Sequence, residues 1–341
     1  MPRIHISNRD RVVATTIIVL IFLLIATLVF WARVPTSISD MDCTLSGNAA
    51  WISVDWTSQP VDVSQVHEFA SDATRRRLRY LYPFVTYVRE DGSFSPGYGN
   101  AIDFVAAFRE VNQDSQLLAW VGVPVLNERR YGIHGWVNLA ESADRERIVD
   151  FSMYAVNELG FDGIHLNVEH VDSGDAGYLL LLEETAAALG SDHTLSVAAN
   201  DWLPAGLNWL PGLGGYKWDS AYYQAVAEHV DQIATMTYDS FMPTPALYSL
   251  WLREQVVGVG RALSDSDTEW LVGISVSREK TRTHRPEAEN MGAGIAGACA
   301  GAARSRLAGL QGIAVYAAWE ADQNDWLLWE QTMTGNQEST Q

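Results

Sequence analysis

The chain has 341 residues, which is enough for one large domain or two ordinary ones. Hydrophobic residues make up 48% of it, including 13 Trp and 13 Tyr, and this composition excludes a disordered chain. The formal net charge of −19 opposes nucleic acid or anionic lipid as a binding partner.

Residues 12–31 form an apolar run without a charged side chain, long enough to cross a bilayer as a helix. Three arginines precede the run and one follows it closely, so the positive-inside rule places the N-terminus in the cytoplasm. A long cleavable signal is the alternative, and it would export the domain as well. We therefore predict a single-pass protein of the cell membrane, with a cytoplasmic segment 1–11, an anchor 12–31, a linker 32–47, an extracytoplasmic domain 48–333 and a disordered tail 334–341.

Apolar periodicity and turn residues predict eight strands after the linker, each followed by a helix. The strands are expected over 50–56, 82–88, 116–125, 161–171, 193–200, 232–239, 270–277 and 312–319. The helices are expected over 64–80, 100–111, 144–159, 176–189, 220–229, 246–263, 286–310 and 324–333, with Ser64 and Asn100 as N-caps of the first two. This alternation is typical of a single (β/α)8 barrel of the TIM type. An open doubly wound sheet would alternate too, but no Gly-rich phosphate-binding turn follows the first strand.

The fourth predicted strand, FDGIHLNVEHV, has one apolar and one polar face. Ile164, Leu166 and Val168 alternate with the polar residues His165, Asn167 and Glu169. In a closed parallel barrel the apolar set faces the helices, so the polar set points to the barrel axis. Glu169 is then expected near the carboxyl-terminal mouth, where such barrels carry their active sites.

These residues resemble the family-18 glycoside hydrolases, which include chitinases and endo-N-acetylglucosaminidases. That family's fourth strand carries Asp-Gly-x-Asp-x-Asp-x-Glu, and the matching segment here is DGIHLNVE, from Asp162 to Glu169, with two aspartates replaced. Its sixth strand carries Met-x-Tyr-Asp, matched by MTYD ending at Asp239, and its eighth strand ends in a tryptophan, matched by Trp319. The three matches occur in the right order on a barrel counted independently, and the resemblance covers about residues 48–333.

The resemblance implies that Glu169 protonates the leaving glycosidic oxygen while the N-acetyl carbonyl of the substrate attacks the anomeric carbon. Tyr238 would hydrogen-bond the acetamido carbonyl, and Asp239 would bind a sugar hydroxyl. Trp319 would form the apolar floor of the sugar subsite, because sugar C–H faces stack on indole. Trp56 and Trp202 are weaker candidates for flanking subsites.

Asn167 stands where the family has the aspartate that orients the acetamido group and stabilises the oxazolinium intermediate. An amide can still hydrogen-bond the acetamide, but it supplies no negative charge for the developing cation. The family-85 endo-N-acetylglucosaminidases resemble this site in having Asn-x-Glu at the corresponding strand end. His165 replaces a deeper aspartate, where it could either tune Asn167 or be a core histidine with its hydrogen bonds satisfied.

Other chemistries find little support in the sequence. The histidines at 193, 229 and 284 lie on separate elements without metal-ligand spacing, and there is no His-Glu-x-x-His, Cys-x-x-Cys or Gly-x-Ser-x-Gly motif. We therefore expect no cofactor and no metal. Cys43 and Cys299 either form a disulfide, as exported proteins allow, or Cys299 is a small buried residue in an Ala/Gly-rich helix.

The sequence thus predicts a membrane-anchored glycoside hydrolase that acts on N-acetylhexosamine-containing glycans with retention of configuration. A non-catalytic carbohydrate-binding barrel is the main alternative, and a cell-envelope scaffold that binds no sugar is the third. The replaced aspartates favour the alternatives. The presence of Glu169, Tyr238, Asp239 and Trp319 favours the enzyme, because a binding protein has little need for a carboxyl group at the acid position.

Overall fold

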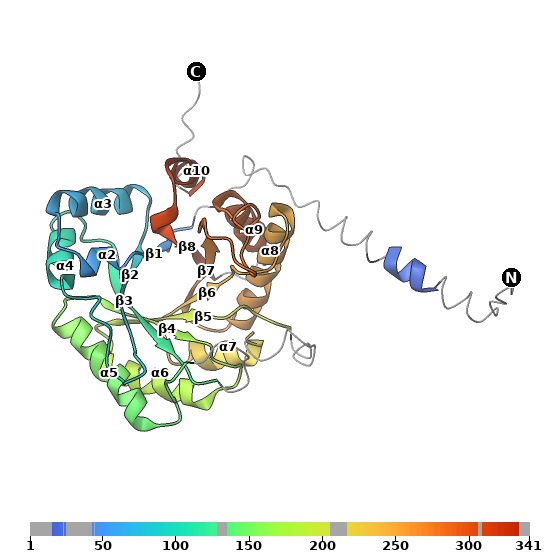
Figure 1. Ribbon diagram of the computed structural model, residues 1–341. Helices are drawn as coiled ribbons and strands as arrows, with labels where there is room; N and C mark the ends of the chain where they lie inside the picture. Colours follow the sequence, from blue (N-terminus) through green and yellow to red (C-terminus); the bar gives the residue numbers. More distant parts are fainter. Residues whose placement is uncertain are drawn as a thin grey trace, which may run out of the picture.

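The computed structural model describes residues 16–22, 24, 43, 45–127, 135–204, 217–305 and 309–333. Its centre is a closed barrel in which β1 to β8 follow one another in sequence order, with the helices around the outside (Figure 1). The strands are β1 Ala49–Ile52, β2 Tyr80–Tyr87, β3 Gln116–Pro124, β4 Gly163–Glu169, β5 Thr194–Ala199, β6 Gln232–Met236, β7 Glu269–Ser275 and β8 Leu310–Tyr316. All neighbours are parallel, and β1 pairs with β8. The predicted barrel is confirmed, and closure excludes an open sheet.

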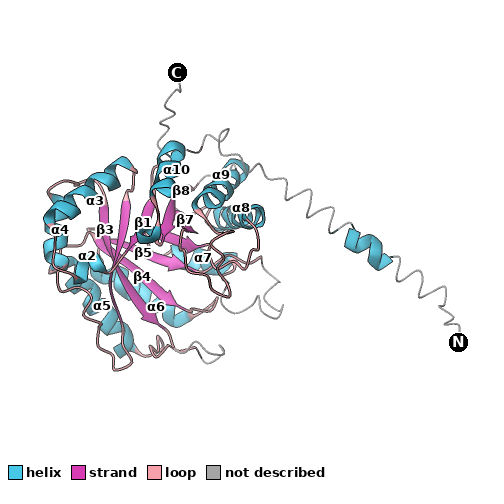
Figure 2. Ribbon diagram, turned by 45° about the horizontal axis from the view of Figure 1, so that its top comes forward, coloured by secondary structure: helices cyan, strands magenta, loops and turns pink. Residues whose placement is uncertain are grey.

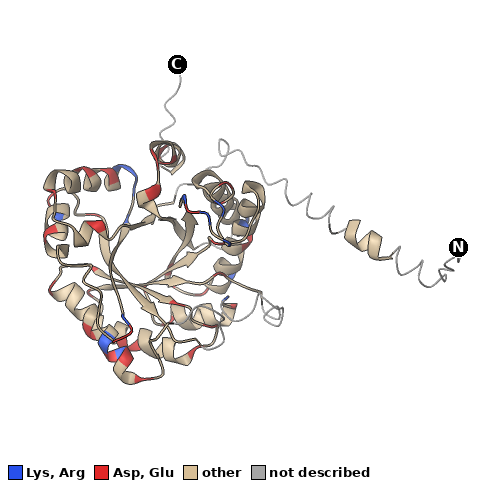
Figure 3. Ribbon diagram, in the orientation of Figure 1, with Lys and Arg blue, Asp and Glu red and all other residues tan. Residues whose placement is uncertain are grey.

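Helices follow every strand and cover the outer face of the barrel (Figure 2). They are α2 Asp55–Ser58, α3 Val63–Arg75, α4 Ala101–Arg109, α5 Ser142–Asn157, α6 Ala176–Leu189, α7 Ser220–Ala227, α8 Pro245–Ala262, α9 Met291–Ser305 and α10 Gln323–Met333, with a 3-10 turn η2 at Ala318–Glu320. Charged residues lie mainly on these helices and on the loops, and few lie on the strands (Figure 3). The negative charge of the chain is therefore carried outside the barrel interior.

Alternation along the strands divides the apolar residues into two cores. Ile164, Leu166 and Val168 of β4 belong to the large cluster between sheet and helices. A separate cluster fills the barrel interior, with aromatic rings from β1, β2 and β3 among its members: Trp51, Tyr80, Tyr82 and Trp120. The orientation predicted for β4 is confirmed, because His165 packs against Trp51 and Tyr82 of this inner cluster.

Every strand ends before its predicted last residue, and β1, β6 and β8 end three or four residues early. The chain leaves β1 at Ile52 and turns into α2, whose Asp55 backbone N–H is bound by the Ser53 hydroxyl, so Trp56 is helical. β6 ends at Met236, and Asp239 lies beyond it with a left-handed φ of 56°. β8 ends at Tyr316, and Trp319 lies in η2. In each case tertiary contacts override the strand propensity of aromatic and β-branched residues.

Helix starts also depart from the prediction. Asp62, not Ser64, caps α3, because its carboxylate accepts the backbone N–H groups of Ser64 and Gln65. Asn100 occupies the N-cap position of α4, but its side chain donates to the Ser58 carbonyl instead of capping. A carboxylate can accept two orphan amides at once, which explains why the aspartate ahead of Ser64 takes the position.

Cys43 and Cys299 form a disulfide with their Cα atoms 5.5 Å apart. The bond joins the segment ahead of β1 to α9, at a sequence separation of 256 residues. It therefore closes nearly the whole barrel into one covalent loop, which restricts the unfolded chain. Of the two alternatives that the sequence left open, the structure shows the disulfide.

The predicted terminal segments fall mainly outside the described residues. Segments 1–11 and 334–341 lie wholly outside them, and only parts of the predicted anchor 12–31 and linker 32–47 are described. Among the residues that are described, no helix combines the length and the hydropathy needed to span a bilayer.

Candidate active site

Glu169 is the last residue of β4 and lies at the carboxyl-terminal mouth of the barrel, exposed to solvent. Its strand pairs with β3 in a register that sets Gly122 beside Asn167 and Pro124 beside Glu169. Tyr238 follows β6 and is half-buried. Burial raises the pKa of the Tyr238 hydroxyl well above its ordinary value, and the neighbouring groups Tyr316, Glu169 and Asp239 add to the rise. Tyr238 is therefore within electrostatic reach of both carboxylates.

Asn167 is paired directly with Glu169. Its Nδ2 donates to Glu169 Oε1 at 2.7 Å, and because a carboxylate accepts, the amide nitrogen must face it. The other amide atom, Oδ1, is buried and has no hydrogen-bond partner among the described residues. A buried acceptor without a partner is uncommon in proteins, so a further hydrogen-bond donor at this position would be favourable.

Aromatic rings form a wall beside this pair. Tyr238 stacks on Tyr316, with ring centroids 4.7 Å apart and an interplanar angle of 8°. Trp319 packs against Tyr316 in a T-shaped arrangement, with ring centroids 5.7 Å apart, and is 45% exposed. An exposed indole at the mouth of the barrel can stack on a sugar ring. The structure thus brings together Glu169, Asn167, Tyr238 and Trp319.

Trp120 of β3 is an inward-facing residue that the sequence did not indicate. Its ring lies 4.8 Å from Phe84 and 6.5 Å from Tyr316 between centroids. Its indole N–H is buried without a partner in the described structure. The predicted strand 116–125 is apolar on both faces, so its pattern could not show which residues point inward.

Trp56 and Trp202 lie away from this group of residues. Trp56 stacks on Phe69 of α3, with ring centroids 4.7 Å apart, and packs in the helix layer. Trp202 donates from Nε1 to Ser220 Oγ at 3.0 Å, and its ring covers Gly258 of α8 so closely that a Cβ there would lie 2.1 Å from it. Their packing gives no support to the predicted roles in flanking subsites.

His165 is a neutral core histidine. Trp51 Nε1 donates to its Nε2 at 2.9 Å, and because an indole N–H can only donate, that nitrogen carries no proton. Its Nδ1 then donates to Ser196 Oγ at 2.8 Å, and this hydroxyl donates onward to Gln232 Oε1. Burial lowers the pKa of His165 to about 3. Its hydrogen bonds run to Trp51 and Ser196 and not to Asn167, so the interpretation as a satisfied core residue fits the geometry.

This histidine should make the fold sensitive to acid. Its folded pKa lies below the unfolded value near 6.5, so its contribution to stability is complete above that pH and is lost as the pH falls toward 3. At pH 4 the loss should reach about 3 kcal/mol. Urea unfolding of the wild type and of His165→Phe at pH 7 and pH 4 measures it. Equal losses in both proteins would contradict the prediction.

No group of three or more His, Cys, Asp or Glu side chains in the described ranges could hold a metal ion. A cavity of about 310 Å³ lies at the opposite end of the barrel, where Leu195 is the second residue of β5 and Asp231 precedes β6. Its lining includes the histidines His193 and His229 and several carboxylate side chains. Because Glu169 is at the carboxyl ends of the strands, this cavity is separate from the candidate site.

Comparisons with known proteins show the fold. No protein-family model matches the chain, and no curated protein matches it in sequence. Solved structures do match: the spore cortex-lytic enzyme SleL of Bacillus cereus has a TM-score of 0.56 at 13% identity, over 85% of this chain and 75% of that one. A class V chitinase from Pseudomonas fluorescens Pf-5 has a TM-score of 0.54 at 16% identity, over 84% and 99% of the two chains. A chitinase from Chromobacterium violaceum ATCC 12472 has a TM-score of 0.56 at 14% identity, over 84% of this chain and 98% of that one.

Proposed function

We propose that this protein is a glycoside hydrolase acting on glycans that contain N-acetylhexosamine. The observation that carries the proposal is the position of Glu169, at the carboxyl end of β4, hydrogen-bonded by Asn167 and near Tyr238. The structural likeness to chitinases and to a cortex-lytic enzyme supports it, because those proteins share the barrel. The fold alone does not define the chemistry, which depends on the residues of the site.

Each residue of the site has a part in substrate-assisted hydrolysis. Asn167 occupies Oε1 of Glu169, which leaves Oε2 to carry the proton to the glycosidic oxygen as the C–O bond breaks. The acetamido oxygen of the substrate forms the bond to the anomeric carbon, and the acetamido N–H donates to the free Oδ1 of Asn167. The Tyr238 hydroxyl, kept protonated by its raised pKa, donates to the acetamido oxygen. Water deprotonated by Glu169 then opens the oxazolinium, with net retention.

A carbohydrate-binding protein without turnover is the second candidate. The neutral Asn167 favours it, since the intermediate is a cation and the amide offers it no charge. The exposed Trp319 and the unpartnered atoms of Asn167 and Trp120 would serve binding equally well.

We also propose that residues 12–31 anchor the protein in the cell membrane with the barrel on the outer side. The apolar run and the arginines ahead of it support this placement. The disulfide between Cys43 and Cys299 supports it independently, because disulfides persist in oxidising compartments.

The function is tested by comparing chitohexaose with cellohexaose, which lacks the acetamido group. The purified full chain in detergent should cleave the first and leave the second intact, and NMR of the fresh products should show the retained anomer. Cleavage of both sugars alike would exclude substrate assistance. Binding of chitohexaose without cleavage would establish the carbohydrate-binding alternative, and binding of neither chitohexaose nor an N-glycan would leave only the scaffold.

A further inference from the structure

The loop after β6 carries two candidate site residues on an unusual backbone. Asp239 and Phe241 have φ values of 56° and 62°, both in the left-handed region. An aspartate adopts this conformation at little cost, but a phenylalanine keeps it only where its surroundings hold it. The loop also begins at Thr237, whose carbonyl accepts the Tyr248 hydroxyl at 2.9 Å, so Tyr238 lies between two anchored positions.

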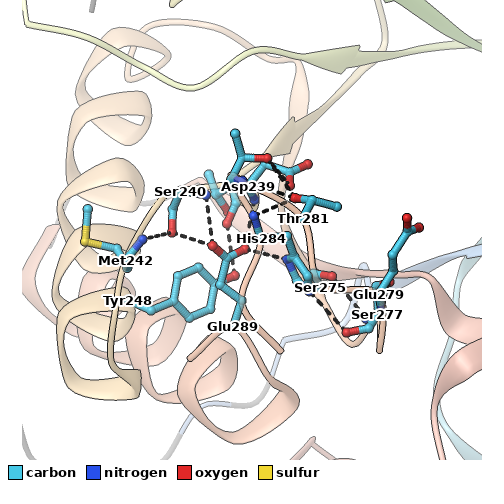
Figure 4. A network of polar contacts seen from close by, with 12 residues as sticks. Asp239, Ser240, Met242, Tyr248, Ser275, Ser277, Glu279, Thr281, His284 and Glu289 are labelled. Atoms are coloured by element: carbon cyan, nitrogen blue, oxygen red, sulfur yellow. Dashed lines mark hydrogen bonds and ion pairs between the residues drawn. The ribbon is translucent and has the colours of Figure 1, made fainter. Parts of the chain in front are cut away.

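Glu289 provides the main anchor. It is 1% exposed, precedes α9, and accepts hydrogen bonds from two backbone amides of the loop (Figure 4). Oε2 accepts the Asp239 N–H at 2.8 Å, and Oε1 accepts the Ser240 N–H at 2.9 Å and the Ser240 hydroxyl at 2.7 Å. A carboxylate that accepts adjacent backbone amides stabilises the backbone conformation in which those amides converge.

His284 supplies the positive partner of this buried carboxylate. Its Nδ1 faces Glu289 Oε2 at 3.0 Å and its Nε2 faces the carbonyl oxygen of Ser277 at 3.1 Å. A neutral imidazole has one N–H, and both neighbours are acceptors, so both bonds exist together only when His284 is an imidazolium. The same segment binds the loop twice more, since Phe241 N–H donates to the Thr283 carbonyl and the Thr283 hydroxyl donates to Asp239 Oδ1.

The charges around His284 favour its protonated form. Burial acts to lower its pKa, but the bonds to Glu289 and Ser277 and the charges of Glu289 and Asp239 outweigh it, and the net pKa is raised. The charge of Glu289 also acts on the Tyr248 hydroxyl and on Asp201, which forms a largely buried ion pair with Lys217.

We propose that Glu289 and His284 are positioning residues, a charged pair that holds Asp239, and through it Tyr238, in the arrangement required for turnover. The inference rests on the proposed function of the site. When His284 loses its proton, one of its two hydrogen bonds disappears and Glu289 is left without its counter-ion. The loop then loosens, so this pair sets the alkaline limit of activity while Glu169 performs the chemistry.

Amide hydrogen exchange tests the positioning without requiring activity. In Glu289→Gln and His284→Gln, protection of the Asp239 and Ser240 amides should fall at least 10-fold at pH 7. In the wild type the protection, corrected for intrinsic exchange, should fall as pH rises through the titration of the His284 ring, followed by NMR. The control is Glu184→Gln, which removes an ion pair with Arg145 between α5 and α6. It should change neither the protection of these amides at pH 7 nor the dependence of that protection on pH.

The pH profile of kcat/KM on chitohexaose is the second measurement. Its alkaline limb should coincide with the His284 titration in the wild type and in Glu184→Gln, and should be lost in His284→Gln, with kcat reduced at least 10-fold. Unchanged protection in Glu289→Gln, or a His284 ring that titrates below pH 6.5, would overturn the inference. If neither variant folds, the wild-type exchange profile decides alone. Changed protection in a protein without turnover would uphold the positioning and refute the proposed function.

Discussion

Glu169→Gln should lower kcat on chitohexaose by roughly 10²–10⁴-fold, with little change in KM. Glutamine has nearly the shape of the acid and can still accept the Asn167 Nδ2 hydrogen bond, so binding is preserved. It has no proton to give to the departing oxygen, so the loss falls on the chemical step. Steady-state kinetics together with calorimetric sugar binding separate the two effects.

The control for this experiment is Glu146→Gln, an exposed residue of α5 on the outside of the barrel. It makes the same change of charge and should leave kcat and KM as they are. Glu169→Gln with turnover equal to the wild type would mean that another group protonates the leaving oxygen. The roles assigned to Asn167 and Tyr238 would then fall with it.

The position of Glu169 could be predicted because it depends on two simple rules. Side chains alternate along a strand, so a strand with one apolar face has its polar side chains on the other. In a closed parallel barrel the apolar face packs against the helices, and the polar side chains therefore point into the interior. His165 obeys the same rule and contacts Trp51 and Ser196 inside the barrel. The same rule sets Asn167 and Glu169 on one face, since they are two residues apart, and the structure adds the hydrogen bond between them.

The strand ends could not be predicted in this way. Trp56 and Trp319 follow strand-like residues, yet both lie in short helical turns, because the chain must leave the barrel to reach the next helix. Trp202 illustrates the same limit, since its place against α8 depends on Gly258, 56 residues later. The pattern of neighbouring residues in the sequence carries no information about contacts between residues this far apart.

Glu289 shows what sequence motifs miss at the site itself. Its bonds to Asp239 and Ser240 join residues about 50 positions apart, and the surrounding segment was predicted as an ordinary helix start. A buried carboxylate has no local signature, because its partners come from another loop. The tyrosine and aspartate of the β6 match could be read from sequence, but the group that holds them could not.

Asn167→Asp should raise kcat on chitohexaose about 10-fold or more, because the new carboxylate places a negative charge beside the oxazolinium that forms in the reaction. In the wild type, Asn167 and Glu169 are joined by a 2.7 Å hydrogen bond. Two carboxyl groups at that separation cannot both be ionised, so they share one proton. The variant would therefore hold the proton that the leaving oxygen needs. As that proton is transferred, the new carboxyl group at position 167 would carry the negative charge that stabilises the oxazolinium.

Asn167→Leu is the matched control, because it keeps the number and branching of the side-chain heavy atoms and removes both polar atoms. It should bind chitohexaose more weakly and lower kcat, since Glu169 loses its donor and the acetamido group loses the Oδ1 acceptor. The order Asp above Asn above Leu would show that the amide orients the acetamido group and lacks only charge. Lower turnover in Asn167→Asp than in the wild type would instead show that the site depends on a neutral donor to Glu169, as an Asn-x-Glu site would.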